Sequence, residues 1–180
     1  MLPLLVACIH EPIVPLRAPD MPGADVLHFD LAGVDRIDLI ESCWSTCPHD
    51  EADRPVASLT TWAVDWNWVR GPAEPCEVIE PTVVVDVTVT LPRWAPPPSS
   101  DPALVDEWNT YLIALTRHEQ GHVELVHTLT DNTAATLVDA GCEGAHAAGA
   151  ALIDRIRTAQ RNYDEGTGSG RTQGASFWGM

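Results

Sequence analysis

One apolar stripe at helical spacing runs through the middle of the chain and limits the folds open to it. Its members recur every three or four residues and are Leu104, Trp108, Tyr111, Leu115, His118, His122, Leu125 and Leu129. Residues with this spacing share one face of an α-helix. Ser100 or Asp101 is suited to cap the helix, with Pro102 in its first turn. Gly141 is a suitable stop, so the sequence predicts a long amphipathic helix whose apolar face needs a partner layer.

Three segments supply strands for that layer. Residues 59–69 alternate Trp and Val with polar residues, and residues 78–92 form a long β-branched run. One face of the second segment is formed by Val83, Val85, Val87 and Val89. The Gly- and Pro-rich turn between the two segments predicts a β-hairpin. Residues 26–33 alternate well enough for a third strand.

Two further helices are predicted on either side of this region. Helical spacing before the first cysteine loop links Val34, Ile37 and Ile40. A helix over residues 143–163 presents a face made by Ala147, Ala150, Ile153, Ile156 and Ala159. Residues 166–180 are rich in Gly and are expected to form a loop. We therefore expect an α+β fold, in which a small antiparallel sheet packs on the long helix and on the C-terminal helix.

The length suits one domain, which we place at residues 25–180. We place residues 1–24 outside this domain, because residues 9–24 contain four prolines and little pattern, which indicates a tether. The run before Cys8, MLPLLVA, resembles the lipobox of a bacterial lipoprotein, in which that cysteine is lipidated. The run is short and lacks basic residues, so two interpretations stay open: a truncated start, or an accidental likeness.

The charge balance excludes some partners. Ten Lys and Arg face 26 Asp and Glu, which gives a formal charge of −16. Such a surface repels nucleic acid and anionic membranes, so no nucleic-acid partner is expected. We expect the chain to be a monomer.

The cysteines indicate an oxidising compartment. Apart from Cys8, four remain, and we expect Cys43 to pair with Cys47 and Cys76 with Cys142. The spacing in CWSTC also fits a metal clip, but no second pair of matching spacing accompanies it.

The pattern HEQGH lies on the buried side of the long predicted helix. His118 and His122 are about 40° apart around a helix, so both imidazoles can face one ion. Neutral histidine suits Zn²⁺, and Glu119 is placed to take a proton from a metal-bound water. The competing interpretation is a pair of hydrogen-bonded core histidines beside a solvated carboxylate, but burying these groups without partners is costly. We therefore predict a zinc site.

A catalytic zinc needs a third protein ligand. His127 lies about 140° round an unbroken helix from His122 and points away. The glycine that would let a third histidine swing back, as in the metzincins, is absent because position 125 is Leu. His127 therefore remains only an alternative ligand, and so do Glu143 and His146 at the start of the C-terminal helix.

Several motifs together resemble a known family. They are TTWAVDWNW, the cysteine that follows it, VTVTLPRW, the DEW of the long helix, HEQGHVEL and NYDEGTGSGRTQGA. This set resembles a bacterial family of predicted secreted zinc-dependent proteases, a domain of unknown function with HExxH and YDxxTxHG motifs. The resemblance covers residues 25–176. It implies a zincin-like fold, secretion and hydrolytic chemistry.

One departure from that family bears on the metal. The closing motif usually has a histidine where this chain has Ser169. Asp164 of the same motif is then the leading candidate for the third ligand. Tyr163 beside it is a candidate to donate a hydrogen bond to an oxyanion, and the alternative is a tyrosine that only packs at a helix end.

These features predict a secreted, periplasmic or envelope-tethered zinc peptidase that acts on a peptide or protein. Glu119 would be the general base, with His118, His122 and Asp164 as the ligands. Two alternatives stay open: a catalytically degenerate zincin that serves as an envelope binding or structural module, and a zinc amidase acting on cell-wall material.

Overall fold

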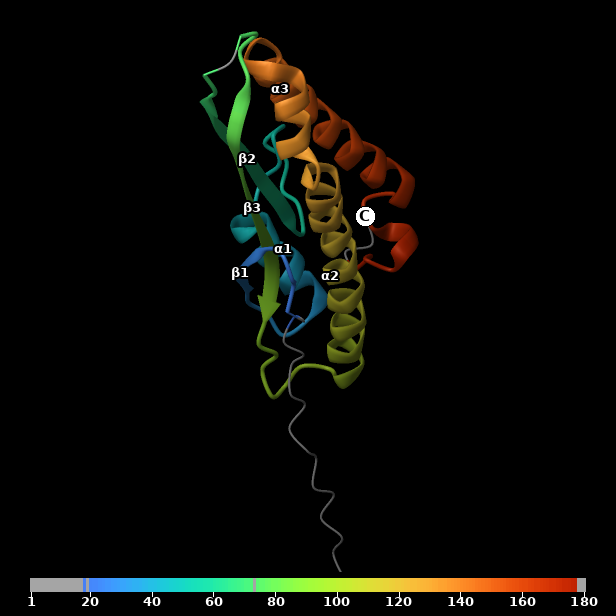
Figure 1. The fold of residues 1–180 in the computed structure, drawn as a ribbon. Coiled ribbons are helices and arrows are strands. Elements are labelled where there is room, and N and C mark those ends of the chain that lie inside the picture. The colour runs from blue at the N-terminus through green and yellow to red at the C-terminus, as the bar shows by residue number, and fades with distance from the viewer. Residues whose placement is uncertain (1–17, 19, 73, 178–180) are drawn as a thin grey trace, which may run out of the picture.

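The computed structural model describes residues 18, 20–72 and 74–177, so the lipidation predicted at Cys8 lies outside the described residues. The elements, in chain order, are β1 (Asp25–Leu31), α1 (Arg36–Thr46), β2 (Leu59–Arg70), β3 (Val78–Trp94), α2 (Pro102–Thr130), α3 (Thr133–Thr167) and a short 3-10 helix η1 (Arg171–Gln173). The sheet forms one layer and α2 with α3 forms the other, as Figure 1 shows. The predicted α+β class is confirmed.

The sheet is mixed, with strand order β1-β3-β2. The predicted hairpin is confirmed, because β2 runs antiparallel to β3. The expectation of an antiparallel sheet is wrong for β1, which pairs parallel to β3 from Asp25 opposite Thr88 to Leu31 opposite Trp94. Residues 32–58, which include α1, carry the chain from one edge of the sheet to the other. This segment together with β2 joins the parallel partners β1 and β3, and parallel pairing requires such a long connection, which residue alternation alone does not reveal.

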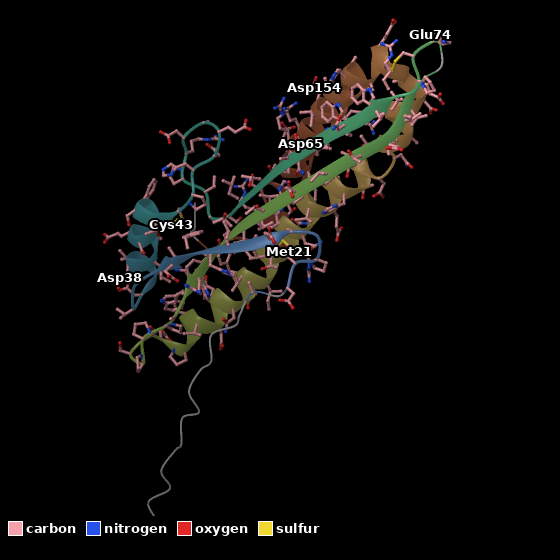
Figure 2. All side chains as sticks on the ribbon, turned by 60° about the vertical axis from the view of Figure 1, so that its left-hand side comes forward. Met21, Asp38, Cys43, Asp65, Glu74 and Asp154 are labelled. Atoms are coloured by element: carbon pink, nitrogen blue, oxygen red, sulfur yellow. A yellow bond between two sulfur atoms is a disulfide. The ribbon has the colours of Figure 1, made fainter. Side chains whose placement is uncertain are left out.

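The core lies between the sheet and α2. The predicted inward face of β3 is confirmed, since Val87 and Val89 are buried and Val83 and Val85 pack against the core. From α2, the stripe contributes buried side chains that include Trp108, Tyr111 and Leu115. Among the described residues, no helix covers the opposite face of the sheet, and Asp65 lies on that face (Figure 2). One side of the sheet is therefore apolar and buried, whereas the other is exposed and carries polar side chains together with Val84.

The two long helices form a hairpin with its apex at Gly141. The helix is interrupted at Asp131 and Asn132, so α2 ends earlier than predicted. The first residues of α3 nevertheless continue in much the same direction as α2 (Figure 1). The reversal occurs at Gly141, whose φ of 61° and ψ of 175° interrupt α3. Glycine alone adopts such a conformation without strain. We call residues 142–167 the returning arm.

Both predicted disulfides form, Cys43 with Cys47 and Cys76 with Cys142. The second joins the turn of the β2–β3 hairpin, next to Glu74 in Figure 2, to the apex of the helical hairpin. It therefore ties the two layers together at one end of the molecule.

The predicted faces of two helices are partly wrong. In α1, Leu39 is buried whereas Ile37 is exposed, and Val34, which precedes the helix, is exposed too. In the returning arm, Ala147 and Ala150 are exposed, and the buried residues are Ala145, Gly149, Leu152 and Ile156. Small residues explain the second difference. A Cβ at Gly149 would lie 2.2 Å from the ring of Trp66, so this arm approaches the sheet through glycine.

The C-terminal segment is not the loop that was expected. It forms η1, and Phe177 beyond it is 1% exposed, with its ring 5.2 Å from those of Trp108 and Tyr111. The segment after the returning arm is thus packed into the core. Within the described residues, no helix is long and apolar enough to cross a membrane.

Candidate metal centre

α2 brings the two histidines of HEQGH together on its buried side. His118 is 4% exposed and His122 is 7% exposed. Their ring centroids are 4.7 Å apart, and their Nε2 atoms are 3.3 Å apart. One helical turn between the residues accounts for this approach, because positions i and i+4 are neighbours on a helix surface.

The returning arm adds Asp164 to the pair. Its Oδ1 lies 3.2 Å from Nε2 of His118 and 3.1 Å from Nε2 of His122. The helical hairpin explains the match, because His118 and Asp164 are each 23 residues from its apex at Gly141 (141 − 118 and 164 − 141). These three side chains form the one group of potential metal ligands found among the described residues.

The three groups perturb one another electrostatically. Burial disfavours the charged ring of His122, but its hydrogen bond to Asp164, the charge of Glu119 and the contact with Gln160 outweigh burial and raise the pKa of His122. Burial acts to raise the pKa of Asp164, but both histidines hold it well below its usual range. The surroundings therefore favour a positively charged His122 ring and an ionised Asp164.

Two glutamines hold the outer nitrogens of the rings. Nδ1 of His122 contacts Oε1 of Gln160, whose Nε2 donates to the backbone oxygen of His122 at 3.0 Å. Nδ1 of His118 lies 2.9 Å from Oε1 of Gln173, in η1. Each ring thus turns its Nε2 toward the other and toward Asp164. Residues beyond metal ligands commonly fix ring orientation in this way.

Tyr163 forms one wall of the cluster. Its ring stacks on that of His118 at 5.2 Å with an interplanar angle of 10°, and meets the ring of His122 edge-on at 4.9 Å. Its hydroxyl accepts a hydrogen bond from Nε2 of Gln173 at 3.0 Å. These contacts describe a residue that packs on the rings, and the oxyanion role stays a prediction.

Glu119 is buried beside the histidines, at 4% exposure. One of its carboxylate oxygens accepts a hydrogen bond from the hydroxyl of Ser58, and the other accepts one from Thr60 at the start of β2. The carboxylate is thus anchored to the edge strand of the sheet. Each oxygen keeps a further lone pair, so the anchored group can still accept a proton.

The structure does not bring the alternative ligands to the cluster. Nε2 of His127 donates to the backbone oxygen of Gly23 at 2.7 Å, on another side of α2. His146 packs its ring on Trp68 at 4.7 Å, near the hairpin turn, and Glu143 is exposed beside the apex. Ser169 is exposed, and its backbone N–H donates to the backbone oxygen of Asp164.

Four residues that surround the cluster were not identified from the sequence. They are Ser58, Thr60, Gln160 and Gln173. Single polar residues carry no pattern of their own. Gln160 had one usable signal, because it is as far beyond Gly141 as His122 is before it, at 19 residues (160 − 141 and 141 − 122). If Gly141 is taken as the apex of a helical hairpin, this equal spacing predicts that Gln160 and His122 lie opposite each other.

The donor set and its spacing fit a zinc ion. Zinc is bound by histidine nitrogen and carboxylate oxygen with bonds of about 2.0–2.1 Å, which places neighbouring ligand atoms of a tetrahedral site about 3.3 Å apart. The three ligand atoms here are 3.1, 3.2 and 3.3 Å apart. The Asp164 side chain is 44% exposed, so solvent reaches the cluster from that side. The residues present therefore suit a three-ligand site with an open position.

Comparison with known proteins gives a family but no activity. No curated protein and no solved structure matches the chain. A family model described as bacterial protein of unknown function, DUF922, matches residues 26–171. The match includes the two histidines of HEQGH and Asp164, as well as Glu119 and Tyr163. That match spans most of the 180 residues. The chain therefore belongs to the DUF922 family of bacterial proteins.

Proposed function

We propose that this protein is a zinc-dependent hydrolase that cleaves peptide bonds. The observation that supports it most is the convergence of two imidazole nitrogens and one carboxylate oxygen within 3.3 Å of one another, on a wall of the molecule that solvent reaches. Three lone pairs at this spacing repel one another unless a proton or a metal ion lies between them. His118, His122 and Asp164 would hold the ion.

Bound zinc would supply a Lewis acid that polarises a carbonyl and activates water near neutral pH. Glu119 follows His118 directly and is fixed by Ser58 and Thr60, so its carboxylate is held in one place before substrate arrives. We assign it the role of general base, which takes a proton from the attacking water and passes it to the leaving amine. Fixed placement of such a group lowers the cost of reaching the reactive geometry.

The fold supports the same proposal at a coarser level. A long helix with HExxH lies beneath a small sheet whose edge strand contacts the glutamate, and we propose that the arrangement is zincin-like. The two disulfides support a location in an oxidising compartment. We therefore propose a secreted or periplasmic protein, with a lipid on Cys8 as the route to an envelope tether.

Metal analysis of the wild-type protein and three variants tests this proposal. Purified wild-type protein should carry about one zinc per chain, and Asp164→Ala and His118→Ala should lose most of it. Glu119→Gln should keep the zinc but cleave a peptide library at least about a hundredfold more slowly, since general-base catalysis contributes roughly 10²–10⁴-fold. Wild-type protein that is folded but binds no zinc would overturn the proposal.

A second function is favoured by one observation. Both oxygens of Glu119 already accept hydrogen bonds from the protein, as a carboxylate with a purely structural role would. The protein would then be a binding module in which zinc stabilises the fold. Zinc binding that raises the melting temperature, with no cleavage of peptides or cell-wall fragments by wild-type protein, would establish this alternative. Cell-wall cleavage alone would identify an amidase instead.

A further inference from the structure

Gln160, on the returning arm, contacts both the ring and the backbone of a candidate ligand. Its Nε2 donates to the backbone oxygen of His122 at 3.0 Å, and its Oε1 contacts Nδ1 of the same residue. A backbone carbonyl can only accept a hydrogen bond, so the amide nitrogen must face it. The amide oxygen is thereby forced to face the ring.

This arrangement favours one position for the ring proton. An amide oxygen cannot donate, so the contact with Gln160 is a hydrogen bond only when Nδ1 of a neutral His122 carries the proton. The lone pair is then on Nε2, which points at His118 and Asp164, so Gln160 acts against the Asp164 carboxylate, which draws the proton to Nε2. Without Gln160 the proton is free to occupy Nε2, where it would block a metal.

The matching contact of His118 lacks this constraint. Gln173 presents Oε1 to Nδ1 of His118 but gives its Nε2 to the hydroxyl of Tyr163. A hydroxyl both donates and accepts, so the Gln173 amide satisfies its partners in either orientation. The two glutamines therefore differ, although they stand in similar places.

We propose that Gln160 is a positioning residue that fixes the His122 ring with its proton on Nδ1 and so keeps Nε2 available to a metal ion. The consequence for metal binding rests on the proposed function, whereas the location of the proton does not. Gln160 is part-buried on α3 and lies opposite His122 across the helical hairpin, so it holds the ring before any ion arrives.

Nitrogen-15 NMR of the histidine rings tests this assignment in metal-free protein at a pH where the rings are neutral. In wild-type protein the His122 proton should be on Nδ1. In Gln160→Leu a substantial fraction of the rings should carry it on Nε2. In Gln160→Glu a carboxylate oxygen still accepts from the ring, so the proton should return to Nδ1. Asn162→Leu, a control at an exposed amide of the same arm, should leave the His122 signals unchanged.

Zinc affinity, measured by competition with a chelator, gives the second readout. Gln160→Leu should bind zinc roughly 10- to 100-fold more weakly, and Gln160→Glu should restore most of the loss. Gln173→Leu should shift the signals of His118 and not those of His122. A protein that binds no zinc would sink the proposed function alone, because the ring proton is still measured.

Three results would overturn the role of Gln160. One is a wild-type His122 that carries its neutral-ring proton on Nε2, which needs no variant. Another is a folded Gln160→Leu protein whose His122 keeps the proton on Nδ1. The last is a folded Gln160→Leu protein whose zinc affinity stays within about twofold of wild type, when wild type does bind zinc.

Discussion

The hydroxyl of Tyr163 lies directly against the backbone of Gly121, where a Cβ would come within 2.1 Å of its oxygen. This contact explains the glycine in HEQGH. In an ordinary exposed helix, Gly→Ala stabilises by up to about 1 kcal/mol. Here the methyl group would push Tyr163 off the His118 ring, and overpacking costs about 1–3 kcal/mol. Gly121→Ala should therefore lower the free energy of unfolding in urea and weaken zinc binding.

Gly166→Ala is the matched control, because nothing lies within 4 Å of a Cβ at that helical position. It should leave stability unchanged or raise it by up to about 1 kcal/mol. Equal effects of the two substitutions would show that Tyr163 does not depend on the space at Gly121.

The two disulfides should differ in what they contribute to stability. Cys76 and Cys142 are 66 residues apart, whereas Cys43 and Cys47 are four apart. Loop-closure entropy predicts a loss of about 4 kcal/mol for the first and about 2 kcal/mol for the second when each pair is replaced by serine. Urea unfolding of the two double variants checks the order. A larger loss for the Cys43 and Cys47 pair would contradict the conclusion that the disulfide between Cys76 and Cys142 ties the two layers together.

Phe177 should stabilise the core far more than its place near the end of the sequence suggests. Its side chain is 1% exposed and contacts the rings of Trp108 and Tyr111. Phe177→Ala should cost about 3–5 kcal/mol, which corresponds to a melting temperature lower by roughly 10 °C. Trp44→Ala, at a side chain that is 60% exposed, should change stability by less than about 0.5 kcal/mol. Comparable losses in the two variants would place Phe177 outside the core.

The metal-free and zinc-loaded proteins should respond to pH in opposite directions. Without metal, the raised pKa of His122 contributes stability below about pH 6.5 that is lost as the pH rises through the folded-state value. The lowered pKa of Asp164 contributes stability above about pH 4 that is lost in stronger acid. Zinc competes with protons for the histidines, so its stabilising effect grows as the pH rises.

Melting temperatures in chelator and in excess zinc, at about pH 5.5 and about pH 8, check this prediction. The gap between the two conditions should be small in acid and large in base. A gap that is independent of pH would show that the metal does not bind the histidines.

The main helix and the histidine pair could be predicted because both depend on local spacing. The stripe from Leu104 to Leu129 fixes one helical face, and HEQGH lies on it. The strand face of β3 followed from alternation in the same way. Glycine at position 141 marked the reversal, although it did not reveal the interruption at Asp131 and Asn132.

Other features depended on the partner layer and could not be predicted. Nothing in the alternation of residues 26–33 distinguishes parallel from antiparallel pairing, so β1 was misassigned. Ile37 and Leu39 are equally apolar, and only the position of the sheet decides that Leu39 is buried. Asp164 came from a resemblance, because its distance in the sequence from His122 hides the contact. The glutamines were missed since their partners are set by the returning arm.

Because the chain reverses at Gly141, the two arms of the helical hairpin pivot about that residue. The returning arm reaches about 35 Å from that residue to Asp164, at about 1.5 Å per residue. A rotation of about 1° at the glycine therefore moves the carboxylate by about 0.6 Å, roughly a third of the bond length between a carboxylate oxygen and a zinc ion. The disulfide from Cys142 to Cys76 holds this pivot against the turn of the β2–β3 hairpin, and so keeps Asp164 aligned with the two histidines.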